Sequence, residues 1–194
     1  MWVIPQELKP NESYIWKRDI FNSAELELIT EIGKSIPMIE GAVDNKESPT
    51  VDARRSKISW IQPLPHTEFI FDRISYALNA VNSSFYNYEL THIEDLQFSE
   101  YDESYSGMYR NHTDDGFDSA TTRKLSFTIQ LSDPTEYDGG DLLLYRFKLD
   151  EPTVAQKEKG LLIAFPSFTI HEVTPVTKGT RYSLVGWAHG PRFR

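Results

Sequence analysis

The segment GMYRNHTDDGF, residues 107–117, contains an imidazole and a carboxylate at a spacing that can bind a metal ion. Positions i and i+2 of an extended strand project to the same face, so the side chains of His112 and Asp114 can converge on one ion. The chain also contains five histidines and 29 acidic residues, so such a pair can arise without function. A solvated turn is therefore the alternative interpretation.

A third ligand would have to come from another strand. His171, in FPSFTIHEVTPV, lies at the end of an apolar segment that has the composition of a strand. Two histidines and one carboxylate leave half of an octahedron open, which is the arrangement that non-haem Fe(II) uses to bind a cosubstrate and oxygen. The alternative for His171 is a structural role at the edge of the core.

A strand further downstream contains an arginine in an unusual position. In TRYSLVGWAHG, alternation places Arg181 on one face together with Ser183, Val185 and Trp187. An arginine on the inner face of a small β-structure is costly unless it meets an anion, and its planar fork matches a carboxylate. The partner is therefore an anionic ligand or one of the acidic side chains of the chain.

Two helices are expected in the first half of the chain. In FNSAELELITEIGKS, Asn22 and Glu25 have the spacing of a capping box, and Gly33 is the expected helix end. Apolar residues at helical spacing follow the cap, namely Leu26, Ile29 and Ile32. A second helix fits HTEFIFDRISYALNAVNSS, with its stop at 82–84. Its apolar positions are Ile70, Ile74, Ala77, Leu78 and Val81.

The pattern changes to that of strands from about residue 88. RKLSFTIQLSD alternates apolar and polar residues, which is typical of a strand with one buried face. Short apolar segments with Gly, Pro and Asp turns follow, namely YDGGDLLLYRF, GLLIAFPSFTIHEV and TRYSLVGWAHG. We expect an α+β fold with a double-stranded β-helix, or jelly-roll, core covered by N-terminal helices. The chain would form one domain over 1–194, with a helix-rich support at 1–87 and a jelly-roll core at 88–190.

Composition narrows the classes of site and partner. The chain has no cysteine, so a metal would have to be held by nitrogen and oxygen. The net charge of −9 disfavours nucleic acid and anionic lipid as partners. We find no secretory signal and no apolar run long enough to cross a bilayer, so no membrane association and a cytoplasmic location are expected. The oligomeric state cannot be predicted.

From about Leu96 to Trp187 the chain resembles the Fe(II)/2-oxoglutarate-dependent dioxygenases, in their prolyl-4-hydroxylase-like branch of PKHD-type hydroxylases with bacterial and phage relatives. The similar motifs occur in order: H-x-D, an Arg-led strand ending in LSD, YDGGDLLL, FPSFTIHEVTPV and GTRYSL. The resemblance implies that His112, Asp114 and His171 hold iron. It also implies that Arg181 pairs with the distal carboxylate of 2-oxoglutarate, with Ser183 beside it.

The family places a tyrosine against the same carboxylate. Tyr101 lies near the matching position, but slightly further from His112 than is common, which would require an insertion in DESYSG. Tyr105 is the alternative. Residues at the positions of the family's substrate pocket are Arg123, Trp187 and Tyr109. The structural alternatives are an exposed basic residue for Arg123 and a core tryptophan for Trp187.

The activity implied by the resemblance is hydroxylation of an amino-acid side chain, peptidyl or free, with proline among the candidates and with release of succinate and CO2. Its cofactors would be Fe(II), the cosubstrate 2-oxoglutarate and O2, with ascorbate as a candidate reductant. The expected partner is a peptide, a protein or an amino acid. Three other classes stay open: a nucleic-acid dealkylating member of the same superfamily, a non-catalytic metal-binding jelly-roll module, and a hydrolytic zinc enzyme, which would leave Arg181 without a role.

Overall fold

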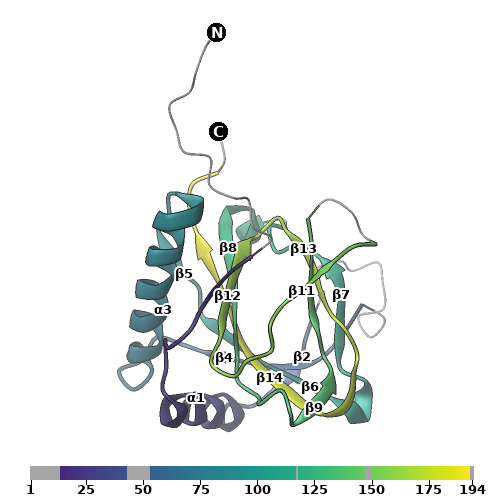
Figure 1. Cartoon of the computed structure of the whole chain (residues 1–194). Helices are drawn as coiled ribbons and strands as arrows, with labels where there is room; N and C mark the ends of the chain where they lie inside the picture. The colour runs from purple at the N-terminus through teal and green to yellow at the C-terminus, as the bar shows by residue number, and fades with distance from the viewer. Residues whose placement is uncertain (1–13, 43–52, 117, 147–149, 193–194) are drawn as a thin grey trace.

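The computed structural model describes residues 14–42, 53–116, 118–146 and 150–192. Most of the elements in these ranges are β-strands, which form two antiparallel sheets of the jelly-roll type beside two α-helices (Figure 1). The larger sheet has the order β1-β12-β8-β14-β6-β4-β2, with β5 and β9 also paired to β14. The smaller sheet has the order β11-β10-β13-β7-β3.

The strands are mostly short, with the exception of β14. The larger sheet comprises β1 (Ile15–Lys17), β2 (Ile39–Glu40), β4 (Lys57–Ile61), β5 (His92–Ile93), β6 (Leu96–Asp102), β8 (Arg123–Gln130), β9 (Tyr137–Gly139), β12 (Leu162–Pro166) and β14 (Val176–His189). The smaller sheet comprises β3 (Arg54–Arg55), β7 (Met108–His112), β10 (Leu142–Tyr145), β11 (Thr153–Val154) and β13 (Ile170–Val173). Strands β1 to β4 precede residue 88, where the sequence pattern predicted only helices. The single-domain division stays a prediction.

Helix α1 (Ser23–Ser35) begins at the predicted cap. The Asn22 side chain accepts a hydrogen bond from the backbone N–H of Glu25, and the Glu25 carboxylate accepts one from the N–H of Asn22, both at 2.9 Å. The predicted end at Gly33 is wrong, because the helix continues to Ser35. A Cβ on Gly33 would lie 2.3 Å from the Phe98 ring, so this glycine allows close approach of the helix to β6.

Helix α3 (Glu68–Val81) buries the five apolar positions that the helical spacing predicted. The α-helix ends at Val81, directly before the predicted stop at 82–84, and a π-helical turn (Asn82–Tyr86) then leads to Asn87, whose φ is 55°. Both helices contribute buried residues to the same hydrophobic cluster as β6, β8 and β14. No helix in the described part of the chain has both the length and the apolar character of a bilayer-spanning segment.

Strand β8 is buried on both faces, contrary to the prediction of one buried face. Its apolar residues, Leu125, Phe127 and Ile129, belong to the cluster shared with the helices. Its polar residues lie on the opposite face, toward the space between the two sheets, where Ser126 and Gln130 form hydrogen bonds with functional candidates. The polar face is therefore buried because it supports a site and not because it packs a second apolar core.

Candidate active site

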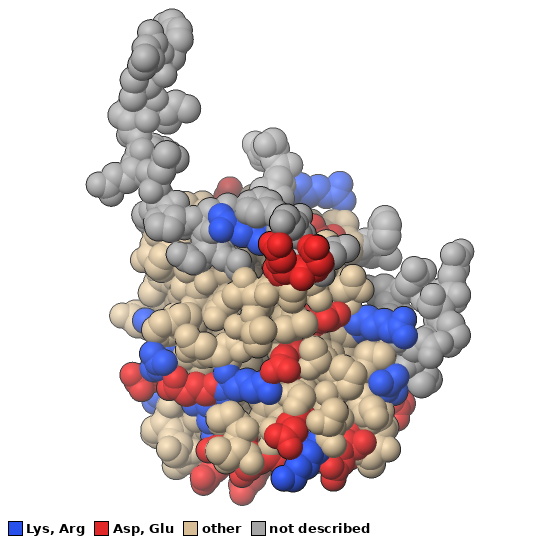
Figure 2. Space-filling view, turned by 45° about the vertical axis from the view of Figure 1, so that its right-hand side comes forward, with Lys and Arg blue, Asp and Glu red and all other residues tan. Residues whose placement is uncertain are grey.

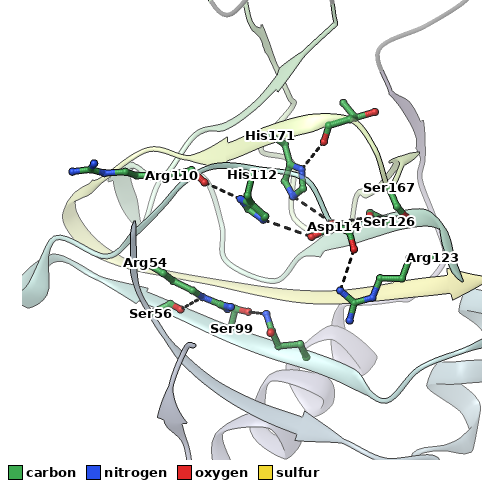
Figure 3. A network of polar contacts seen from close by, with 12 residues as sticks. Arg54, Ser56, Ser99, Arg110, His112, Asp114, Arg123, Ser126, Ser167 and His171 are labelled. Atoms are coloured by element: carbon green, nitrogen blue, oxygen red, sulfur yellow. Dashed lines mark hydrogen bonds and ion pairs between the residues drawn. The ribbon is translucent and has the colours of Figure 1, made fainter. Parts of the chain in front are cut away.

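The three predicted metal ligands meet at one point between the sheets (Figure 3). His112 at the end of β7 and His171 in β13 are direct partners in the antiparallel ladder. Asp114 lies just beyond β7, in a bend held by a hydrogen bond from its backbone N–H to the Ser167 carbonyl, at 2.8 Å. The three ligand atoms lie within 4.8 Å of one another.

Backbone carbonyls orient both imidazole rings toward the carboxylate. Nδ1 of His112 lies 2.8 Å from the Arg110 carbonyl oxygen, and Nδ1 of His171 lies 2.9 Å from the Thr169 carbonyl oxygen. A carbonyl can only accept, so each Nδ1 is the donor, and Nε2 is the atom that each ring turns inward as a candidate metal ligand. The two Nε2 atoms lie 3.6 Å and 3.5 Å from oxygens of Asp114.

The charge states also suit a cation. Burial lowers the pKa of His171 to about 4, against the attraction of the Asp114 carboxylate. Burial alone would raise the pKa of Asp114, but the imidazoles of His171 and His112 and the Ser126 hydroxyl hold that pKa below its usual value. The Ser126 hydroxyl donates to Asp114 at 2.6 Å. Deprotonated nitrogen and oxygen atoms that face one another repel unless a cation lies between them, so this donor set fits a divalent metal.

A cavity of about 340 Å³ opens beside these ligands, which is within the usual range for a small-molecule site. Among the described residues, five buried side-chain polar atoms have no hydrogen-bond partner, and four of them belong to residues that line this cavity. They are Arg54 Nη2, Thr128 Oγ1, Arg181 Nη1 and Trp187 Nε1. The cavity wall therefore presents several donors that only a ligand or water can satisfy.

Arg181 is 2% exposed and extends from β14 into the cavity. Its Nη2 donates to Gln130 Oε1 at 3.0 Å, whereas its Nη1 has no partner. The alternative of a structural ion pair finds no support, because no carboxylate of the described residues pairs with it. Ser183 lies two positions further along the same face, is buried and also lines the cavity.

The two candidate tyrosines occupy different environments. Tyr101 is 3% exposed, lines the cavity and lies opposite Arg181 in the β6–β14 ladder. Tyr105 lies in a short 3-10 turn (Glu103–Tyr105) outside the cavity lining, and its hydroxyl is 3.2 Å from the Glu100 carbonyl oxygen. Of the two tyrosines, Tyr101 is therefore the one that lies beside Arg181 on the cavity wall.

The three predicted substrate residues also line the cavity. The Arg123 guanidinium lies 3.9 Å from the centroid of the Trp187 ring and forms two hydrogen bonds to Glu94, at 2.6 and 2.9 Å. Its Nη1 also reaches the Asp114 carbonyl oxygen, at 3.4 Å. The Tyr109 ring stacks on the His112 ring with a centroid distance of 3.6 Å. Arg123 is thus already paired and holds its neighbours in place.

Sequence reasoning missed three residues of this site. Ser126 supports Asp114, Glu94 neutralises Arg123, and Arg54 lines the cavity. Glu94 also accepts from Nε2 of His189, whose Nδ1 lies 2.8 Å from the Thr122 hydroxyl. The alternating pattern of β8 could have indicated Ser126, because it places this residue on the polar face of the strand. No local pattern indicates Arg54 or Glu94, because their contacts are with residues distant in the chain.

Comparison with known proteins agrees with this geometry. Residues 96–189 match the family described as the 2OG-Fe(II) oxygenase superfamily. A PKHD-type hydroxylase of Prochlorococcus marinus is 40% identical over 84 residues, which cover 43% of this chain and 37% of that protein. Another from Picosynechococcus sp. is 38% identical over 96 residues, which cover 49% of this chain and 42% of that protein. The match thus spans less than half the length of these relatives.

Solved structures extend the similarity to nearly the whole chain. A prolyl hydroxylase of Trichoplax adhaerens, solved with a hypoxia inducible factor peptide fragment, has a TM-score of 0.76 and 18% identity, covering 92% of this chain and 84% of that one. A prolyl-4-hydroxylase of Pseudomonas putida has a TM-score of 0.73 and 19% identity, covering 95% of both chains. At 18–19% identity, the similarity to these two structures shows a shared fold only. Residues 96–189 are therefore similar to the 2OG-Fe(II) oxygenase superfamily, and the chain has a prolyl-hydroxylase-like fold.

Proposed function

We propose that this protein is an Fe(II)- and 2-oxoglutarate-dependent dioxygenase that hydroxylates an amino-acid side chain, peptidyl or free, and releases succinate and CO2. One observation carries the proposal: a single cavity contains both the His112, Asp114 and His171 donor set and the unpaired guanidinium nitrogen of Arg181. A metal-binding module without catalysis would need the first feature but not the second. The family match supports the same cofactors, Fe(II), 2-oxoglutarate and O2.

The residues have separable roles in this proposal. His112, Asp114 and His171 hold Fe(II), which when bound couples O2 reduction and decarboxylation of the keto acid to hydroxylation of a C–H bond. Arg181 binds the distal carboxylate of 2-oxoglutarate through the nitrogen that lacks a protein partner, and Tyr101 and Ser183 flank that carboxylate. Ser126 holds the Asp114 carboxylate in its orientation.

The other end of the cavity would receive the substrate. Val185 and Trp187 line it with apolar surface, which excludes water from the reacting C–H bond. A peptide or amino acid fits this site better than a nucleic acid. The net charge is −9, and Lys and Arg side chains on the face in Figure 2 are interspersed with Asp and Glu around a broad uncharged area. The peptide bound by the Trichoplax adhaerens protein supports the same class of substrate.

The test is substrate trapping followed by mass spectrometry. Protein loaded with Fe(II) and 2-oxoglutarate without oxygen is incubated with candidate peptides and amino acids, and oxygen and ascorbate are then admitted. We expect succinate formation and a gain of about 16 Da, one oxygen atom, on the substrate. Stimulation by methylated oligonucleotides alone would replace this proposal with the dealkylase, and failure to bind 2-oxoglutarate would leave a metal-binding module.

A further inference from the structure

Arg54 is the third arginine on the cavity wall, after Arg123 and Arg181. It lies in β3 at the edge of the smaller sheet, directly opposite Tyr109 of β7. Its side chain is well buried, because the residue is only 7% exposed. In the view of Figure 3, Arg54 and Arg123 both lie below the metal ligands, Arg54 to the left and Arg123 to the right.

The guanidinium of Arg54 is held in one position by its neighbours. Its Nε donates to the Ser56 hydroxyl at 2.7 Å, and its Nη1 donates to the Ala42 carbonyl at 3.2 Å. Its central carbon lies 4.6 Å from the centroid of the Tyr109 ring. A Cβ on Gly41 would lie 2.5 Å from Nε, so the glycine makes room for the guanidinium. Side-chain entropy is therefore already lost before any ligand binds.

One nitrogen of this fixed group, Nη2, is buried and has no hydrogen-bond partner. No carboxylate of the described residues forms an ion pair with Arg54, although the exposed Glu40 also lines the cavity. The other two arginines differ in this respect. Glu94 neutralises Arg123, and Arg181 serves the cosubstrate in the proposed function. Within the described part of the chain, the hydrogen-bond partners of this buried cation are thus all neutral, and an anion would relieve the cost of its burial.

Arg54 lies next to Tyr109, one of the predicted substrate residues. Its guanidinium lies against Tyr109, and the Tyr109 ring stacks on the metal-ligand candidate His112. We propose that Arg54 binds a carboxylate of the primary substrate, so that this enzyme selects substrates with an acidic group. The carboxylate belongs to an acidic side chain in a peptide, or to the α-carboxyl end of an amino acid or peptide. This inference rests on the proposed function.

Binding of matched acid and amide probes tests the inference without turnover. The protein is loaded with Zn(II), which is redox inert, and with saturating 2-oxoglutarate, which occupies Arg181. N-acetylproline and N-acetylprolinamide form one pair, and N-acetylglutamic acid α-amide and N-acetylglutamine amide form the other. Each probe is titrated by ligand-observed NMR. The first pair reports an α-carboxylate and the second a side-chain carboxylate.

We expect wild-type protein to bind the acid of at least one pair about tenfold more tightly than its amide, the usual size of one charge-assisted contact. Arg54→Gln should abolish this preference, and Arg54→Lys should keep part of it because the charge remains without the fork. Arg55→Gln is the matched control, because Arg55 lies in the same strand but donates to the Tyr105 and Ser106 carbonyls. It should retain the preference.

Equal binding of acid and amide by the wild type would overturn the inference, and this comparison needs no variant to fold. Retention of the preference in Arg54→Gln, or its equal loss in Arg55→Gln, would also overturn it. Calorimetry of Zn(II) and 2-oxoglutarate separates the two hypotheses. If both bind tightly and no acid preference exists, only the role of Arg54 fails. If 2-oxoglutarate does not bind, the proposed function itself fails.

Discussion

Arg181 and Tyr101 lie directly opposite each other on β14 and β6, with the guanidinium carbon of Arg181 5.4 Å from the centroid of the Tyr101 ring. Gln130 satisfies one terminal nitrogen of this arginine and leaves the other, Nη1, unpaired. Neither residue can move far without breaking the backbone pairing between β6 and β14. The pair therefore defines a rigid end of the cavity where an anion can be bound.

Arg181→Lys should weaken 2-oxoglutarate binding far more than metal binding. Lysine keeps the positive charge but loses the planar fork, so we expect a loss of about 1.5–3 kcal/mol, roughly ten- to a hundredfold in affinity. Calorimetric titration with 2-oxoglutarate on Zn(II)-loaded protein measures the change, and titration with Zn(II) alone is the control. If the variant unfolds while its folded fraction keeps the wild-type affinity for the keto acid, Arg181 has a structural role.

Tyr101→Phe and Tyr105→Phe distinguish the two candidate tyrosines. Only Tyr101 lines the cavity, so loss of its hydroxyl should reduce 2-oxoglutarate affinity by about 0.5–1.5 kcal/mol, the usual contribution of a hydrogen bond. Tyr105→Phe should leave that affinity unchanged, because its hydroxyl lies against Glu100. The same calorimetric titration serves for both. The opposite ranking would transfer the role to Tyr105.

His171→Ala should remove most of the affinity for Mn(II) or Zn(II) while the fold is kept. Three ligands that converge within 4.8 Å bind as a set, so the loss of one leaves an incomplete site. His66→Ala is the control, because His66 is exposed on the surface. Calorimetry measures the metal and circular dichroism the fold. Undiminished metal binding in His171→Ala would exclude the three-residue site.

Glu94→Gln should destabilise the protein in a pH-dependent manner. Burial raises the pKa of Glu94, but the hydrogen bonds and charges of Arg123 and His189 outweigh it, so the pKa lies below its ordinary value. The carboxylate therefore stabilises the fold above the unfolded pKa of about 4.3, and this stabilisation is lost as the pH falls through the folded pKa. We expect a cost of about 1.5–3 kcal/mol at pH 7.

Urea unfolding of wild type and Glu94→Gln between pH 7 and pH 3 measures this difference. The gap in the free energy of unfolding should shrink as the pH falls below about 4. Glu158→Gln is the control, because its ion pair with Arg18 lies on the surface and should contribute little at any pH. A gap that stays constant down to pH 3 would mean that the Glu94 charge is not what stabilises the network.

Local patterns predicted the features that depend on neighbours in the chain. The capping box of Asn22 and Glu25, the buried face of α3 and the shared face of β14 all follow from periodicity or from side chains a few residues apart. Their physical causes act within one element. The spacing of His112 and Asp114 also indicated that they could meet, although Asp114 lies beyond the strand and not within it.

Features that depend on contacts between distant segments were not predictable. Gly33 looked like a helix end, but its role is close approach to Phe98 on another element. Arg123 was predicted to contact the substrate, but it forms an ion pair with Glu94, which lies between β5 and β6. The short strands β2 and β3 have two residues each, too few for alternation to show. The roles of these residues and strands depend on which distant segments they contact, and composition does not indicate those contacts.

The length of β14 has an evolutionary consequence. This strand is continuous from Val176 to His189 and presents Arg181, Ser183, Val185 and Trp187 to the cavity. Deleting or inserting one residue between the first and last of these would turn every later side chain to the opposite face of the sheet. Changes of specificity among homologues should therefore arise through substitutions in this strand and through insertions in loops. An alignment of homologues should be free of gaps between positions 181 and 187, whereas the connections around the cavity vary in length.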